Sequence, residues 1–257
     1  MDDLLTSASI IGPAFIAGLL VLATHVPLGR EVLKRGIIFL DIAIAQIAAL
    51  GVIFAISLDL HDHALAVQLI AVASALLGAA LLHYTELRFP AIQEALIGTI
   101  FVLAATAALL LLANNPHGVE HFADLLSGQI LWVSNTQLLI LAAVTLAILL
   151  CWKILAPAMQ QRFFYPLFAV AITASVQLVG IYLVFSSLII PALAMRQVKK
   201  YPEEKAYALG VVAYGLGVIA SQMYDLPTGP VIVWMLAISA VITVLFLPMI
   251  DSPRRKA

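Results

Sequence analysis

Long runs of uncharged, apolar residues are the feature that most constrains how this chain folds. From Phe164 to Met195, for example, no residue carries a charge. A helix that crosses a bilayer needs about 20 apolar residues, and only helices and closed barrels satisfy every backbone polar group in lipid. The chain is 63% hydrophobic and 11% charged, whereas soluble domains are roughly 25% charged. We therefore predict an all-α integral membrane protein, a polytopic bundle with a single transmembrane domain over residues 1–257.

Nine spans account for the apolar runs. They are expected near 8–26, 37–58, 64–84, 95–113, 136–152, 164–183, 184–198, 206–224 and 229–249. The run over 164–198 is ambiguous, because it is long for one crossing and short for two. Ser186, Ser187 and Pro191 interrupt it, so we expect one full helix, a tight turn and a short returning helix. The alternative is a single crossing here and eight spans in total.

The distribution of lysine and arginine favours nine spans over eight. With nine spans and the N-terminus outside, all 13 basic residues lie on one side of the membrane, which the positive-inside rule assigns to the cytoplasm. With eight spans, the basic groups at 153–162 and 196–205 would lie on opposite sides. We therefore expect the N-terminus outside and the C-terminus inside. The acidic N-terminus does not resemble a cleavable signal peptide.

Motifs for catalysis are absent from the sequence. The phosphate-binding pattern GxxxxGK[ST] does not occur, so ATP hydrolysis is expected in a separate subunit. The patterns GxSxG, HExxH and CxxC are also missing, and the single cysteine, Cys151, allows neither a disulfide nor a cysteine metal cluster. The net charge of −1 gives no indication of nucleic-acid binding. The expected class is a transporter or a transporter subunit, not an enzyme.

Two polar residues stand inside an otherwise aliphatic span. Asp41 and Gln46 lie in GIIFLDIAIAQIAALGVIFAI, residues 36–56. A carboxylate inside a span costs about 2.5–3.5 kcal/mol on insertion scales, which makes Asp41 a functional candidate. The alternative is that Asp41 pairs with Lys34, Arg35 or the backbone at the helix end. Gln46 lies deeper and either lines a translocation path or bonds to a neighbouring helix.

The loops expected outside are rich in histidine and in acidic residues. His61 and His63 lie in DLHDH, and His117 and His121 lie in NNPHGVEHFAD, which contain no lysine or arginine. Imidazole is a good ligand for zinc, and His117 and His121 share a face if their segment is helical. These four histidines are a candidate metal contact, and a solvated acidic loop is the alternative.

Four stretches, in order along most of the chain, carry a family likeness. They are VLKRGIIFLDIAIAQIAALG, EALIGTIFVLAATAALLLL, VQLVGIYLVFSSLIIPALAMR and YDLPTGPVIVW. They resemble the permease subunits of ABC-type zinc, manganese and iron importers. The first looks like the family's segment in which an aspartate and a histidine follow a basic pair. The second resembles its acidic–small–Ile-Gly segment, here Glu94 to Gly98, and the fourth resembles its turn before the last span.

The resemblance implies a homodimeric permease in a bacterial inner membrane, with the ion path on the dimer axis. Its partners would be cytoplasmic ABC ATPase subunits and an extracytoplasmic metal-binding protein, within membrane lipid. The cargo would be a divalent transition metal, zinc favoured over manganese or iron by the outer histidines, and no cofactor would be permanently bound. A shortened helix over 156–162, with Ala156, Gln160 and Arg162, is the expected ATPase contact, where relatives have a longer cytoplasmic loop.

The chain departs from the family at the site itself. In the family the aspartate and histidine are four residues apart and are proposed to contact the metal, whereas here these positions hold Ile42 and Gln46. Asp41 lies roughly 140° from Gln46 around a regular helix, so the two cannot chelate one ion together. An amide is also a poorer zinc ligand than imidazole. Two alternatives therefore stay open: a non-transporting scaffold or regulatory subunit, and a stand-alone secondary transporter.

Overall fold

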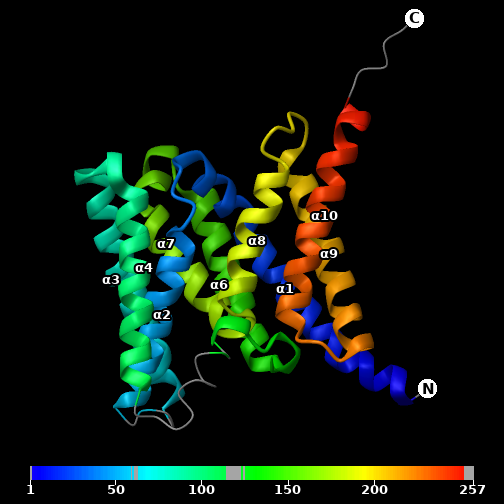
Figure 1. The fold of residues 1–257 in the computed structure, drawn as a ribbon, viewed down its shortest axis with the longest axis horizontal. Coiled ribbons are helices and arrows are strands. Elements are labelled where there is room, and N and C mark those ends of the chain that lie inside the picture. Colours follow the sequence, from blue (N-terminus) through cyan, green and yellow to red (C-terminus); the bar gives the residue numbers. More distant parts are fainter. Residues whose placement is uncertain (1, 59, 61–62, 114–122, 124, 252–257) are drawn as a thin grey trace, which may run out of the picture.

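The computed structural model describes residues 2–58, 60, 63–113, 123 and 125–251, and over these residues the chain is helical without strands (Figure 1). The all-α prediction is confirmed. The helices are α1 (Asp2–Arg35), α2 (Leu40–Ser57), α3 (Ala64–Arg88), α4 (Gln93–Leu112), α6 (Asn135–Ile154), α7 (Pro157–Val179), α8 (Ile181–Ala194), α9 (Pro202–Tyr224) and α10 (Thr228–Asp251), with the 3-10 turns η1 (Pro90–Ile92) and η2 (Ile130–Trp132).

Eight of the described helices are long and apolar enough to cross a bilayer, and α8 is a shorter apolar helix. At about 1.5 Å per residue, the 14 residues of α8 extend about 21 Å, less than the roughly 30 Å of the hydrocarbon core. Eight long helices and one short one agree with the nine predicted segments. The alternative in which 164–198 forms one crossing is wrong, because α7 and α8 are separate helices.

The break between α7 and α8 lies at Gly180, and not at Ser186, Ser187 and Pro191 as predicted. Gly180 has φ 80° and ψ 161°, a conformation that side chains with a Cβ rarely adopt. Ser186 and Ser187 lie inside α8, and their hydroxyls donate to carbonyl oxygens four residues earlier at 2.8 and 2.6 Å. The serines therefore satisfy their hydrogen bonds on the helix itself and do not interrupt it.

Three glycines bring separate chain segments into backbone contact at the end of the bundle where α7 ends. A Cβ added to Gly128 would collide with the backbone of Val179, and one added to Gly180 would collide with Gly128. A Cβ added to Gly229 would collide with the carbonyl oxygen of Ser127. We call Gly128, Gly180 and Gly229 the glycine junction. It holds the segment before η2 against the end of α7 and the start of α10.

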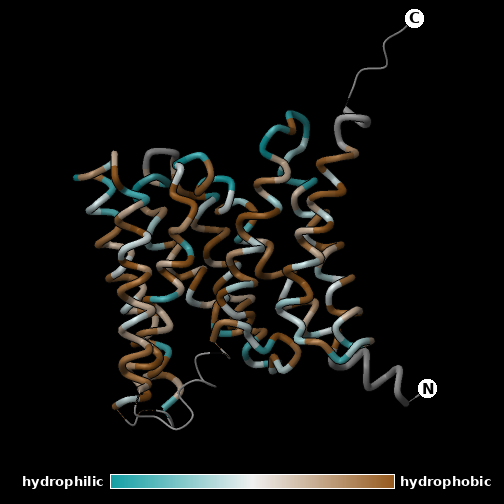
Figure 2. Tube along the Cα trace, viewed as in Figure 1, coloured by the Kyte–Doolittle hydropathy of each residue, from teal (hydrophilic) through white to brown (hydrophobic). Residues whose placement is uncertain are grey.

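The described basic residues gather at the opposite end of the bundle, where α1, α3 and α6 finish and α7 and α9 begin (Figures 1 and 2). They are Arg30, Lys34, Arg35, Arg88, Lys153, Arg162, Arg196, Lys199, Lys200 and Lys205. We call this the basic end. The groups at 153–162 and 196–205 therefore share one end of the bundle, as nine segments require.

Large apolar side chains are exposed on the outward faces of the bundle. Leu77 on α3, Leu110 on α4, Leu139 on α6 and Leu245 on α10 are each at least 66% exposed. In Figure 2, hydrophobic residues dominate the middle of the helices, and hydrophilic residues lie mainly at their ends. This distribution is expected where lipid, rather than water, surrounds the helices.

The substitution Gly180→Ala should lower the thermal stability of the purified protein. A Cβ at this φ is strained by about 1–3 kcal/mol, and the collision with Gly128 adds to that cost. The matched control is Gly98→Ala in α4, where an added Cβ meets no atom within 4 Å. Thermal unfolding in detergent should separate the two variants. Equal midpoints for Gly180→Ala, Gly98→Ala and the wild type would contradict the role of the glycine junction.

Candidate functional site

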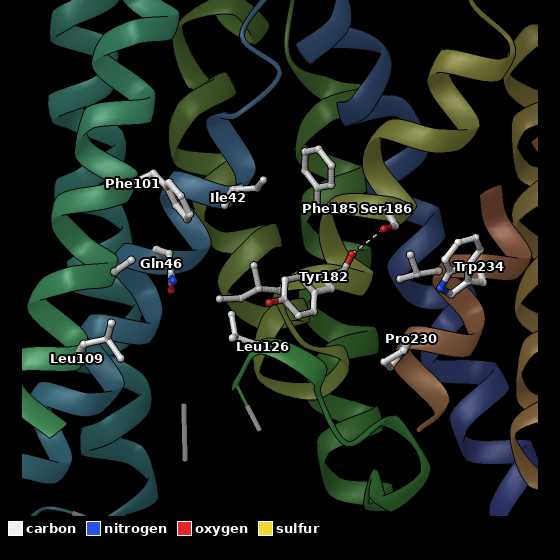
Figure 3. A pocket seen from close by; sticks show the side chains of 13 residues that line it. Ile42, Gln46, Phe101, Leu109, Leu126, Tyr182, Phe185, Ser186, Pro230 and Trp234 are labelled. Carbon is white, nitrogen blue, oxygen red and sulfur yellow. Dashed lines mark hydrogen bonds between the residues drawn. The ribbon is translucent and has the colours of Figure 1, made fainter. Parts of the chain in front are cut away.

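A cavity of about 540 Å³ lies between α2 and α4 on one side and α8 and α10 on the other (Figure 3). Ligand pockets typically enclose about 300–1,000 Å³, so its size suits a bound small molecule. We call it the central cavity. It is lined by Ile42, Gln46, Phe101, Ala105, Leu109, Leu126, Ile181, Tyr182, Phe185, Ser186, Pro230, Val233 and Trp234.

Gln46 supplies the most buried polar group in the wall of the central cavity. It is 2% exposed, and its Oε1 atom has no hydrogen-bond partner among the described residues. Figure 3 shows its amide projecting toward the cavity. A buried acceptor without a hydrogen-bond partner lowers the stability of the fold by about 1–3 kcal/mol. Such a group therefore usually bonds to water, a ligand or another chain. Gln46 is therefore a polar residue of the cavity wall whose buried Oε1 lacks a partner among the described residues.

The facing wall of the cavity is aromatic. Tyr182, in the first turn of α8, is 53% exposed, and Trp234 on α10 is 69% exposed. The hydroxyl of Ser186 donates to the carbonyl oxygen of Tyr182 at 2.8 Å. The sequence alone singles out neither Tyr182 nor Trp234. Tyr182 lies two residues after Gly180, the glycine that ends α7. This position indicates a role for Tyr182 only when the break between α7 and α8 is known to lie at Gly180.

Asp41 lies in the first turn of α2 and is not among the residues that line the central cavity. It is fully buried, and neither carboxyl oxygen has a hydrogen-bond partner among the described residues. Lys34 and Arg35 do not form its ion pair: both contact Glu31, at 3.5 and 3.2 Å, and Arg35 also contacts Glu86 at 3.7 Å. The predicted alternative of pairing with these two bases is therefore not what the structure contains.

A second acidic residue lies close to the start of α2. Glu94, in the first turn of α4, accepts a hydrogen bond from the backbone N–H of Phe39 at 3.1 Å through Oε1, while its Oε2 is buried without a partner. Phe39 precedes Asp41 by two residues. Two carboxyl groups with unpartnered oxygens, Asp41 of α2 and Glu94 of α4, thus lie near the start of α2. Because α2 is unbroken over Leu40–Ser57, Asp41 and Gln46 remain on different faces, as predicted from the regular helix.

The structure places only one of the four outer histidines. His63 is exposed immediately before α3, and its backbone N–H donates to the carbonyl oxygen of Leu60 at 2.9 Å. His61, His117 and His121 lie outside the described residues. Within the described part of the chain, no group of three or more histidine, cysteine, aspartate or glutamate side chains is arranged to hold a metal ion. The outer-loop metal contact stays a prediction.

Residues 156–162 form the start of α7 rather than a separate short helix. Ala156 is the N-cap of α7, and the Nε2 of Gln160 donates to the carbonyl oxygens of Trp152 and Leu155 at 2.8 and 3.1 Å. Gln160 therefore ties the end of α6 to the beginning of α7. Arg162 is exposed at a second cavity of about 530 Å³. The other residues that line this cavity are Glu31, Lys34, Arg35, His83, Glu86, Leu87 and Gln161.

Comparison with known proteins assigns this bundle to a family. The sequence matches the ABC 3 transport family over residues 7–160 and 153–247. The chain belongs to the ABC 3 transport family. One relative, described as a "probable metal transport system membrane protein" of Chlamydia muridarum (strain MoPn / Nigg), is 27% identical over 191 residues. That match spans 66% of this chain and 65% of the relative, which is slightly less than two thirds of the relative's length.

The fold of this family member also occurs among solved structures. PsaBC from Streptococcus pneumoniae, in complex with Fab, is similar with a TM-score of 0.73 and 21% sequence identity. The similarity covers 91% of this chain and 90% of the matched one. The fold of that solved chain therefore extends over nearly the whole of this chain.

The substitution Asp41→Asn should leave the thermal stability unchanged or raise it. A fully buried carboxyl group destabilises the fold whether it is ionised or protonated, because either form is removed from water, and the amide matches its shape and carries no charge. Gln93→Leu is a useful comparison, because it removes the bond from Nε2 of Gln93 to the carbonyl oxygen of Leu82 at 2.9 Å and should cost about 0.5–1.5 kcal/mol. A loss for Asp41→Asn as large as that for Gln93→Leu would show that the carboxylate is bonded.

Proposed function

We propose that this chain is the membrane permease subunit of an ATP-driven ABC importer that moves a divalent transition metal into the cytoplasm. The observation that carries this proposal is the match to the ABC 3 transport family over almost the whole chain. The metal-transport description of the chlamydial relative supports a metal as the cargo. ATP hydrolysis belongs to a separate subunit, and the metal is a substrate rather than a resident cofactor.

The basic end faces the cytoplasm in this proposal, and the N-terminus lies outside. Support comes from the ten described basic residues, which share that end of the bundle. The cytoplasmic ABC ATPase would contact the start of α7, at Ala156, Gln160 and Arg162. Because Gln160 bonds to the last carbonyl groups of α6, a displacement at this contact would move α6 and α7 together.

Two further partners follow from the proposal. A second copy of the chain would cover the side of the central cavity on which Tyr182 and Trp234 are exposed, so that the path lies on the dimer axis. An extracytoplasmic metal-binding protein would dock at the opposite end from the basic residues, near the loops that hold His61, His63 and His117. Those loops favour zinc over manganese or iron, because imidazole is a good zinc ligand.

Two other functions would use the same fold differently. A non-transporting scaffold is suggested by the glutamine at the family's histidine position and by the short connection between α6 and α7. A stand-alone secondary transporter would need no ATPase. The intact central cavity favours a transporter over a scaffold, because a scaffold has no need of a chamber between α2, α4, α8 and α10.

Uptake by the reconstituted complex tests the proposed function. Proteoliposomes that contain this chain, its ATPase and its binding protein should accumulate radioactive zinc, manganese or iron only when ATP is supplied. Gln46→Ala should reduce uptake because it removes the buried amide of the cavity wall, and Asp41→Asn reports whether the second candidate lies on the path. Thr99→Ala on the exposed face of α4 is the matched control and should transport normally. A complex that hydrolyses ATP but accumulates none of the three metals would contradict the proposal.

A further inference from the structure

The central cavity lacks the side chains that bind a bare transition-metal ion. Among the described residues that line it there is no aspartate, glutamate, histidine or cysteine. Its polar side chains are the amide of Gln46, the phenol of Tyr182, the hydroxyl of Ser186 and the indole of Trp234. Zinc sites in proteins usually offer three or four nitrogen, thiolate or carboxylate ligands at about 2.0–2.3 Å. One neutral amide oxygen is a poor substitute for such a set.

The cavity would also compensate poorly for the hydration free energy that an ion loses when it sheds its water. Transfer of an isolated charge into an apolar medium costs tens of kcal/mol, and most of the wall is aliphatic or aromatic. A hydrated ion fits no better. Six waters occupy about 180 Å³ at about 30 Å³ each, well below the cavity volume, and their hydrogen atoms would face a wall with few acceptors.

The same wall suits a small organic molecule. Binding sites for such molecules are mostly apolar, with a few polar groups that fix orientation, and the volume of about 540 Å³ lies within their usual range. Gln46 would offer its amide to the ligand once its side chain turns toward the cavity, because its unpartnered Oε1 is buried beneath the cavity surface in this structure. On the facing wall, Tyr182 and Trp234 offer aromatic faces on which a flat group can stack.

We propose that the central cavity binds the metal inside a small organic chelator, so that a neutral chelate rather than the bare ion is the cargo. The chelator supplies the metal's ligands, and the cavity recognises the chelator. The ligand class is a compact complex with at least one N–H or O–H donor directed at Gln46 and a flat face directed at Tyr182 and Trp234. This inference rests on the proposed function, because it takes the chain to be the permease of a metal importer.

The test uses a doubly labelled chelate in the reconstituted complex of permease, ATPase and binding protein. Zinc bis(histidinate), a neutral complex that carries N–H donors and two flat rings, is prepared with radioactive zinc and tritiated histidine. Radioactive zinc chloride in a non-coordinating buffer and tritiated histidine without zinc are run in parallel. We expect ATP-dependent accumulation of zinc and histidine in the same ratio as in the supplied chelate. Zinc supplied without histidine should accumulate less.

Two variants tie the uptake to the central cavity. Gln46→Leu removes the hydrogen-bond acceptor and should lower chelate uptake about three- to tenfold. Ala105→Phe fills the cavity from α4 and should lower it by at least about tenfold. Ala107→Phe is the matched control, because Ala107 lies two residues further along α4 and lines a different groove, formed with α2 and α3. ATP hydrolysis by each complex checks that the variants are folded.

The possible outcomes separate this inference from the proposed function. Accumulation of zinc without histidine overturns the chelate and leaves a metal importer. A second result also overturns the inference: both labels accumulate, but Ala105→Phe and Ala107→Phe change this accumulation equally. The central cavity would then be filled by lipid or by the second copy. If no zinc accumulates in either form, and manganese and iron are not taken up, the proposed function itself fails.

Discussion

The left-handed backbone at Gly180 is the feature on which the arrangement of the site depends. It ends α7 and starts α8 within one residue, and its missing Cβ lets the backbone of Gly128 pack against it. As a result α8 begins at Ile181 and presents Tyr182, Phe185 and Ser186 to the central cavity. A residue with a side chain at this position would have to displace either the segment before η2 or the start of α8.

The rest of α8 is held in place from the side away from the cavity. Gly29 of α1 approaches so closely that an added Cβ would collide with the carbonyl oxygen of Leu188. The hydroxyl groups of Ser187 and Tyr214 are hydrogen-bonded at 2.8 Å, which joins α8 to α9. A short helix fixed at its start by the glycine junction and along its back by α1 and α9 forms a well-defined wall. Such a wall fits the proposed site, in which the cavity would recognise its ligand by shape.

Composition and charge were sufficient to predict the class of fold, because no water-soluble surface can be built from so few polar residues. The basic residues also gave the right number of apolar segments. The position of the break was missed because serine and proline interrupt helices in many contexts, but Ser186 and Ser187 bond back to their own helix. Gly180 was visible only as part of a family likeness, since its φ angle cannot be read from the sequence.

The candidate site was only partly predictable. Gln46 stood out because an amide in an aliphatic span requires a partner, and the geometry of a regular helix was enough to separate it from Asp41. The facing residues could not be predicted, because Tyr182 and Trp234 are more than 130 positions from Gln46 and reach the cavity only through helix packing. Ordinary aromatic residues of a span carry no local signal for such a role.

The proposed importer requires the cavity beside Gln46 to open alternately to the two sides of the membrane, and this requirement tests the proposal most directly. Cys151 is the chain's one cysteine, so Cys151→Ser gives a background in which the thiol introduced by Gln46→Cys can be labelled alone. A membrane-impermeant maleimide would be applied from either side of proteoliposomes that contain the complete complex. We predict that the reactive side changes between the nucleotide-free and the ATP-bound, hydrolysis-arrested complex. Labelling from the same side in both states would contradict the proposal.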